Sequence, residues 1–169
     1  ELISIDDYLE EIKSIYKSGI EKGMAGYDDE KKKLIQLCKA ALALSPNNHQ
    51  VYAYLARAYV DKDNNLAIDY ANKSIDINPA NAVAFFARAN AKKALGDLQG
   101  SIADFNKAIE IDPKFSNAYY NRGNTKSDLG DEEGAILDFE LAIASSPEDL
   151  KFQADSFSNI GLAKLRLGD

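Results

Sequence analysis

The side chains best suited to chemistry are few in this chain and stand apart in the sequence. His49 is the only histidine and lies beside a proline turn, where alone it completes neither a catalytic dyad nor a metal site. Cys38 is the only cysteine and shares a helical apolar stripe with Leu34 and Ala41, which is typical of a packed thiol rather than a nucleophile. These two residues therefore predict no catalytic centre.

A cluster of oxygen-bearing side chains at residues 61–65 superficially resembles a calcium loop. Asp61, Asp63 and Asn64 are present, but the glycine and the terminal glutamate required by such a loop are missing at their positions. The chain has no phosphate-binding loop or dinucleotide fingerprint, and nothing singles out a carboxylate pair for acid–base work. We expect a protein that is not an enzyme and that has no metal and no cofactor. An enzyme with an unrecognised site is the alternative class, which a substrate screen would reveal.

Composition and charge restrict the class of partner. The chain has 169 residues, 46% hydrophobic and 28% charged, as in an ordinary globular protein. Its net charge of -7 would repel a phosphate backbone, so we expect no nucleic-acid partner. No apolar run approaches the ~20 residues that span a bilayer, so we expect no membrane insertion. The single cysteine and the lack of a signal-peptide pattern favour a cytoplasmic location, and the start at Glu1 suggests a processed or excised chain.

The elements that position these side chains are set out by proline and glycine. The four prolines, Pro46, Pro79, Pro113 and Pro147, are spaced by 33, 34 and 34 residues, and each predicts a helix end and a turn. Gly-Asp pairs at 96–97, 130–131 and 168–169 lie about halfway along the intervals, where glycine can end one helix and aspartate can cap the next. In the first interval Asp63-Asn64 takes this place, and we expect the asparagine to adopt the left-handed conformation.

Between these turns the apolar and small residues recur with helical spacing. Offsets of three and four residues predict amphipathic helices in pairs. Residues 48–81 supply Tyr52, Ala56, Tyr59, Ala67, Ala71, Ser74 and Pro79. Residues 82–115 supply Phe85, Ala89, Lys92, Ser101, Phe105, Ala108 and Pro113 at matching positions. Residues 116–149 supply Tyr119, Gly123, Lys126, Ala135, Phe139, Ala142 and Pro147.

A repeat of about 34 residues, built from two helices and closed by proline, resembles the tetratricopeptide repeat. The resemblance covers three full repeats, at 48–81, 82–115 and 116–149. It adds a degenerate N-terminal helix pair at 1–47 and a C-terminal half repeat at 150–169, a single helix that is truncated or capping. Lys92, Lys126 and Ala71 depart from the pattern, which usually has aromatic residues there. The resemblance implies an all-α fold, a right-handed superhelical α-solenoid of antiparallel helix pairs with a concave groove.

The resemblance also implies which side chains line that groove, because the first helix of each pair faces it in the family. The predicted groove residues are Tyr54, Arg57, Phe86, Asn90, Lys93, Asn117, Tyr120, Asn121, Asn124 and Asn159. Asparagine amides suit a peptide backbone, aromatic rings suit an anchor, and the two cations suit an acidic group. The alternative is an inert, solvated helix face.

One subfamily binds the carboxylate tail of heat-shock chaperones through a clamp of cations and asparagines. Asn90 and Asn121 match two positions of that clamp. Phe86, Asp155 and Asn159 stand where the clamp has cations, and Asp155 would repel a carboxylate. We therefore expect no chaperone-tail binding of that type.

The predicted function is a protein–protein interaction module, an adaptor or scaffold that binds a peptide or helix of a partner in its concave groove. The alternative is a structural or self-association module excised from a larger multidomain protein. Ile160 and Leu167 are expected to be uncovered on the last helix, which would make a homo-oligomer possible there or receive further sequence. Arg88 and Asp104, like Arg122 and Asp138, are expected to pair within each repeat, the alternative being separate solvated charges.

Overall fold

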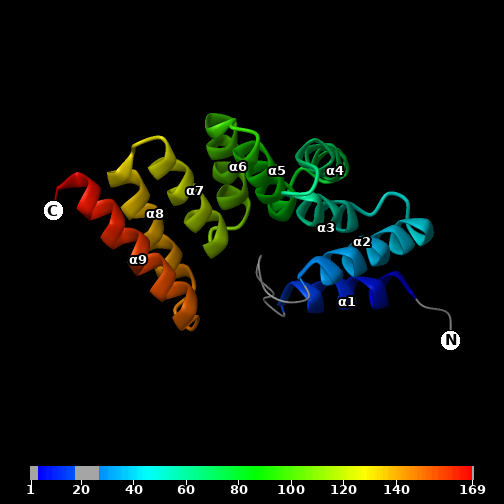
Figure 1. Cartoon of the computed structure of the whole chain (residues 1–169). Coiled ribbons are helices and arrows are strands. Elements are labelled where there is room, and N and C mark those ends of the chain that lie inside the picture. The colour runs from blue at the N-terminus through cyan, green and yellow to red at the C-terminus, as the bar shows by residue number, and fades with distance from the viewer. Residues whose placement is uncertain (1–3, 18–26, 169) are drawn as a thin grey trace. The chain divides into compact units, whose positions relative to one another are not determined.

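The structure, a computed structural model, describes residues 4–17 and 27–168, and these contain helices and turns but no strands (Figure 1). The helices are α1 (Ile5–Lys17), α2 (Tyr27–Leu44), α3 (His49–Tyr59), α4 (Asn64–Ile77), α5 (Ala82–Ala94), α6 (Leu98–Ile111), α7 (Ser116–Asp128), α8 (Glu132–Ser145) and α9 (Leu150–Leu167). The predicted all-α class is confirmed. Within these described ranges, no helix is long and apolar enough to cross a membrane.

The helices fall within the predicted repeat boundaries in pairs. Residues 48–81 contain α3 and α4, residues 82–115 contain α5 and α6, and residues 116–149 contain α7 and α8. The predicted segment 1–47 contains α1 and α2, but its residues 1–3 and 18–26 lie outside the described part, as does residue 169 of the half repeat. The boundaries themselves stay a prediction.

Aspartate caps and left-handed glycines form the turns inside the pairs. Asp97 and Asp131 each accept a hydrogen bond from the backbone N–H three residues on, at 2.9 Å. Gly96 and Gly130 adopt φ of 87° and 83°, as a helix-ending glycine should. In the first pair the left-handed residue is Asp61, with φ of 65°, so the expectation for Asn64 was wrong. The Asn64 side chain instead accepts from the Asp61 N–H at 2.9 Å, which holds this turn.

The chain divides into two compact units, residues 1–87 and 88–169, and each is described by itself. In the first unit α2 packs against both α1 and α3, and α3 packs against α4. Its core includes Ile12, Leu34, Cys38 and Leu55, all almost fully buried. Burial raises the pKa of the Cys38 thiol to about 12, so at neutral pH it is an inert packed thiol, as its stripe predicts.

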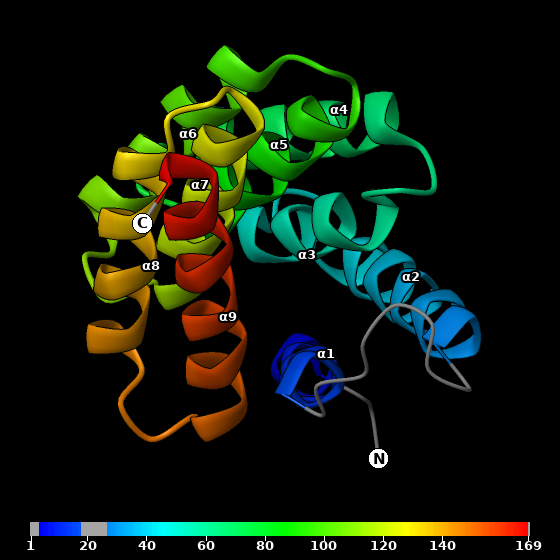
Figure 2. The ribbon, with the colours of Figure 1, turned by 60° about the vertical axis from the view of Figure 1, so that its left-hand side comes forward.

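In the second unit α7 packs against both α6 and α8, and α8 packs against α9 (Figures 1 and 2). The close approach of α7 and α8 depends on Gly123. A Cβ at this position would lie 2.9 Å from the Cε1 atom of Phe139 and 3.2 Å from the Ala135 carbonyl oxygen. Because Phe139 is only 1% exposed, its ring has little room to move away.

The last helix is held to the second unit by its apolar side. Ile160 is 9% exposed and packs with Ala135 and Phe139, so the expectation that it is uncovered was wrong. The sequence pattern misleads here because α9 is apolar on more than one side. Leu167 is 46% exposed, as expected, but so are its counterparts Leu95 at 51% and Leu129 at 42%, both of which precede a further helix. Exposure at this position therefore indicates no partner.

Candidate functional site

Two buried ion clusters fix the helices that carry the candidate site. Arg122 donates to the two carboxylate oxygens of Asp138 at 2.8 and 2.6 Å, and the Lys126 ammonium lies 2.9 Å from the same carboxylate. Arg88 and Lys92 surround Asp104 in the same way, at 2.7 to 2.8 Å. The predicted Arg–Asp pairs are thus confirmed. The lysines that replace the usual aromatic complete each cluster, which sequence reasoning missed.

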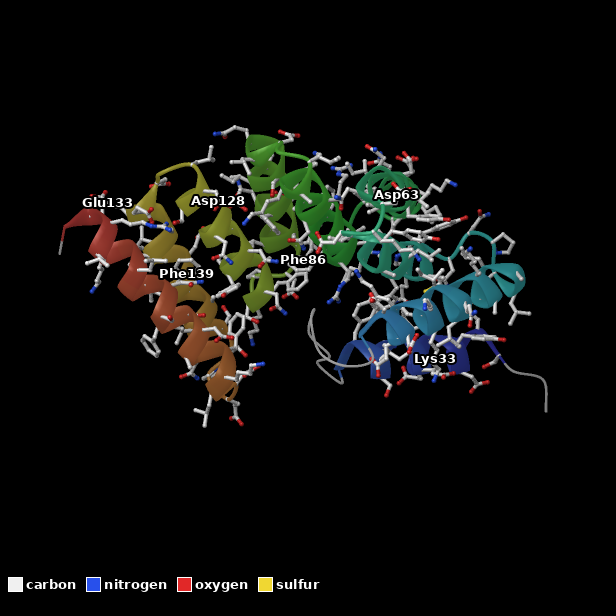
Figure 3. The ribbon with its side chains drawn as sticks, viewed as in Figure 1. Lys33, Asp63, Phe86, Asp128, Glu133 and Phe139 are labelled. Carbon is white, nitrogen blue, oxygen red and sulfur yellow. The ribbon has the colours of Figure 1, made fainter. Side chains whose placement is uncertain are left out.

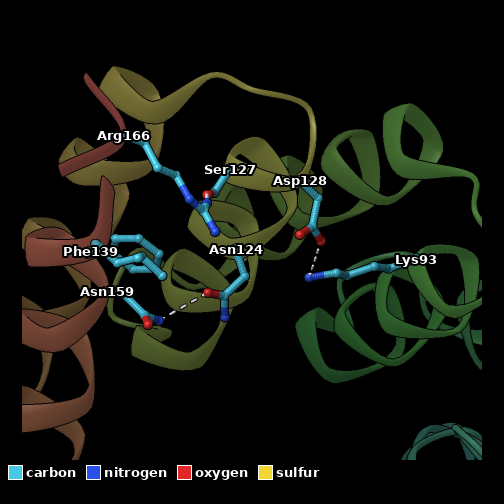
Figure 4. A pocket seen from close by; sticks show the side chains of 8 residues that line it. Lys93, Asn124, Ser127, Asp128, Phe139, Asn159 and Arg166 are labelled. Atoms are coloured by element: carbon cyan, nitrogen blue, oxygen red, sulfur yellow. Dashed lines mark hydrogen bonds and ion pairs between the residues drawn. The ribbon is translucent and has the colours of Figure 1, made fainter. Parts of the chain in front are cut away.

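A pocket of about 290 Å³ opens in the second unit (Figure 4). It is lined by side chains from α5, α7, α8 and α9: Lys93, Asn124, Ser127, Asp128, Phe139, Asn159, Leu162 and Arg166. Three of these, Lys93, Asn124 and Asn159, are predicted groove residues. Leu162 and Phe139 contribute apolar area, so the pocket can accept a chain that is partly polar and partly aliphatic.

Asparagine amides form the polar centre of this unit. The Asn159 amide donates to the Asn124 carbonyl oxygen at 3.1 Å and to the Tyr120 hydroxyl at 3.0 Å, which occupies both of its N–H groups. Farther along, the Asn121 amide donates to the Asn90 carbonyl oxygen at 3.0 Å. These bonds hold the amides in fixed orientations. Fixed donors and acceptors recognise a polar ligand at low entropic cost.

The charges around the pocket are paired with one another (Figure 4). The Lys93 ammonium lies 2.9 Å from an Asp128 carboxylate oxygen. Arg166 donates to the Ser127 hydroxyl at 2.6 Å and to Glu132 at 3.0 Å. Each cation therefore has an acidic neighbour, and the pocket carries no large excess of either sign. Ligands that supply neutral polar groups suit such a site better than a lone carboxylate does.

The other predicted residues of the second unit surround this centre in different ways. Tyr120 packs its ring against Phe139 and Phe152, with centroid distances of 5.6 and 5.3 Å. Asn90 and Asn121 are half-buried in their own amide pair. Asn117 is exposed in the first turn of α7 and does not line the pocket.

The three predicted residues of the first unit form a separate aromatic and cationic group. The Arg57 guanidinium lies 4.0 Å from the ring centroid of Tyr16 and 5.7 Å from that of Phe86. Tyr54 stacks on Tyr16 at 5.1 Å, and burial raises the pKa of the Tyr54 hydroxyl. Phe86, labelled in Figure 3, is only 6% exposed and offers little surface to a ligand.

Sequence reasoning missed Ser127 and Arg166, although spacing contains a signal for both. Ser127 follows Asn124 by three residues and Arg166 follows Asn159 by seven, so each lies on the same helix face as a predicted residue. Tyr16 was missed as a partner of Arg57 because it belongs to the degenerate first pair. The described residues contain no group of three or more acidic, histidine or cysteine side chains that could hold a metal ion.

Comparison with known proteins gives this arrangement a family. A profile described as TPR repeat matches residues 89–130, and one described as Tetratricopeptide repeat matches residues 116–149. The crystal structure of MamA is similar over 83% of this chain and 81% of that chain, with 25% identity and a TM-score of 0.68. The chain belongs to the tetratricopeptide repeat family. Tetratricopeptide repeats are typically protein-interaction modules rather than enzymes, and this tetratricopeptide repeat protein is one by its repeats.

Two further structures share the fold of this tetratricopeptide repeat protein. TTC0263, a thermophilic TPR protein of Thermus thermophilus, has a TM-score of 0.76 and 18% identity over 98% of this chain and 84% of that one. The first TPR of Spaghetti (RPAP3), bound to the HSP90 peptide SRMEEVD, has a TM-score of 0.64 and 23% identity over 72% of this chain and 94% of that one. No curated protein sequence matches the chain.

Proposed function

We propose that this protein is an adaptor that binds an extended segment of a partner protein along the first helices of its repeats, with the asparagine pocket as the anchoring point. The observation that carries the proposal is the Asn124–Asn159 pair. Both N–H groups of the Asn159 amide are used within the protein, so its carbonyl oxygen is left to accept, and the Asn124 amide is left to donate. One donor beside one acceptor matches the backbone N–H and C=O of an extended peptide.

The pocket favours a particular kind of segment. Leu162, which is 47% exposed, and Phe139 offer contact to an aliphatic side chain next to the bound peptide group. Lys93 and Arg166, the two cations among the described residues that line the pocket, already pair with carboxylates, so neither is dedicated to an acidic tail. We therefore propose an uncharged segment with small or aliphatic side chains as the ligand.

The peptide-bound relative supports the use of such a surface but not the same ligand. The structure of the first TPR of Spaghetti contains an HSP90 peptide. In this chain Phe86, Asp155 and Asn159 stand at the cationic positions of the chaperone-tail clamp, and Asp155 is exposed. A chaperone tail is consequently not the partner that we propose.

The test is a pull-down from native lysate with the wild-type chain and an Asn124→Ala, Asn159→Ala double variant side by side. Proteins captured by the wild type are then measured individually by calorimetry. We expect the double variant to lose affinity by about tenfold or more, since two backbone hydrogen bonds are removed. Glu140→Ala, at an exposed position of α8 away from the pocket, is the matched control. Unchanged affinity of the double variant would place the contact on another surface.

A further inference from the structure

One stripe of α9 is uncovered, on the side opposite the pocket. Phe157 is 58% exposed, Lys164 is exposed, and no described atom outside its own helix lies within 4 Å of a Cβ built on Gly161. These residues correspond to Tyr119, Gly123 and Lys126 of α7, each 38 positions earlier, and both helices end in a left-handed glycine. We call Phe157, Gly161 and Lys164 the open stripe.

In α7 the corresponding stripe is covered by α8. The ring of Phe139 lies against Gly123, where a Cβ would come within 2.9 Å of it. The Lys126 ammonium lies 2.9 Å from the Asp138 carboxylate and 3.4 Å from the Gly134 carbonyl oxygen. The covering helix thus supplies a small residue, an aspartate and a phenylalanine in register with the stripe.

The helix α6 has the same pattern. Ser101, Asp104 and Phe105 are buried, at spacings identical to those of Ala135, Asp138 and Phe139, and Asp104 lies 2.8 Å from the Lys92 ammonium. Both covering helices also have a buried alanine three residues after the phenylalanine, Ala108 and Ala142. The shared sequence is a small residue, two others, Asp-Phe, two others and alanine.

We propose that the open stripe of α9 is a docking site for an amphipathic helix of a partner protein that carries this small-x-x-Asp-Phe-x-x-Ala pattern. Gly161 receives the edge of the partner's phenylalanine ring, and Lys164 pairs with its aspartate. The stripe has Ile160 where α7 has Arg122, so the aspartate meets one cation there instead of two. The bound helix is therefore held less by charge than α8 is held on α7.

A second copy of this chain is a poorer occupant than a separate partner. The two described helices with the pattern, α6 and α8, already bury their own phenylalanines, since Phe105 is 0% and Phe139 is 1% exposed. To reach the open stripe of another molecule, either helix would have to leave its own core. A partner with an unburied helix of this pattern has no such cost.

The test uses a synthetic peptide with the sequence of residues 131–149, labelled for fluorescence anisotropy and titrated against the whole chain. This peptide copies α8, and we expect saturable binding at one peptide per chain. Gly161→Leu should abolish binding because its side chain occupies the space of the phenylalanine ring. A peptide with Phe139→Ala should also fail to bind. A peptide with Asp138→Asn should bind about fivefold or more weakly, through loss of the ion pair with Lys164.

The controls separate docking from folding and from the pocket. Leucine is a better helix former than glycine, so Gly161→Leu should melt no lower than the wild type and its loss of binding cannot be ascribed to unfolding. The Asn124→Ala, Asn159→Ala variant should bind the peptide as the wild type does, which makes this site independent of the proposed adaptor function. Binding that survives Gly161→Leu, or no binding at any soluble peptide concentration, would overturn the proposal. So would a dimer in sedimentation that Gly161→Leu dissociates, because the occupant would then be a second copy.

Discussion

At the residue scale, glycine has opposite consequences at two corresponding positions. Gly123 and Gly161 occupy the same place in α7 and α9, but only Gly123 has another helix against its Cα. A glycine within a helix is less favourable than alanine because of its backbone entropy. At Gly123 that cost is offset by the close packing of Phe139, whereas at Gly161 nothing in the described chain offsets it.

Alanine substitution should therefore change stability in opposite directions at the two positions. Gly123→Ala should lower the free energy of unfolding by about 1–3 kcal/mol through overpacking, partly offset by helix propensity. Gly161→Ala should raise it by about 0.5–1 kcal/mol. Urea unfolding followed by circular dichroism measures both. Equal effects of the two substitutions would mean that the packing of Phe139 does not require the glycine.

Asp138 is the residue whose loss we expect to be most costly. Its side chain is 2% exposed and faces both Arg122 and Lys126, so Asp138→Ala leaves two cations without their carboxylate. Removing one partner of a buried pair typically costs about 3–5 kcal/mol. Glu110→Ala breaks the exposed Lys107–Glu110 pair instead, and an exposed pair contributes only about 0–1 kcal/mol. Chemical denaturation of both variants should show this difference, and similar losses would mean that Asp138 is solvated.

At the element scale, the attachment of α9 depends on one side of the helix. Ser156, Ile160 and Ala163 are buried, whereas the exposed residues Phe157 and Leu165 lie on another side. Because α9 packs against α8 through a narrow stripe, few side chains determine whether it stays in place. Both its pocket face and its open stripe depend on this attachment.

We expect Ile160→Ala to lower the free energy of unfolding by about 2–4 kcal/mol, since it removes a buried side chain from the contact with Phe139. Leu165→Ala, at a position that is 70% exposed, should change it by no more than about 0.5 kcal/mol. Hydrogen exchange on α9 amides would show whether the loss is local. Equal protection of α9 in both variants would contradict its attachment through Ile160.

Across the whole molecule, the repeat period carried most of what the sequence could predict. Proline and Gly-Asp spacing located the helix pairs, because these residues act locally on the backbone. The roles of Lys92 and Lys126 were not predictable, since their partners lie on another helix and long side chains reach in several directions. The burial of Phe86 and Ile160 could not be read from periodicity, which does not tell which apolar side meets a neighbour. Three of the ten proposed groove residues line the pocket.

The internal pairing of charge at the pocket has a consequence for how ionic strength acts on this acidic chain, whose net charge is -7. Lys93 and Arg166 each face a carboxylate of the protein itself, so an uncharged ligand forms no new ion pair when it binds. At about 0.5 M sodium chloride, where the Debye length is only a few ångströms, affinity should therefore fall less than about threefold from its value in dilute buffer. Calorimetry of one identified partner across a salt series measures this. A steep decline would indicate recognition by counter-charge, and the neutral segment that we propose would then be the wrong ligand.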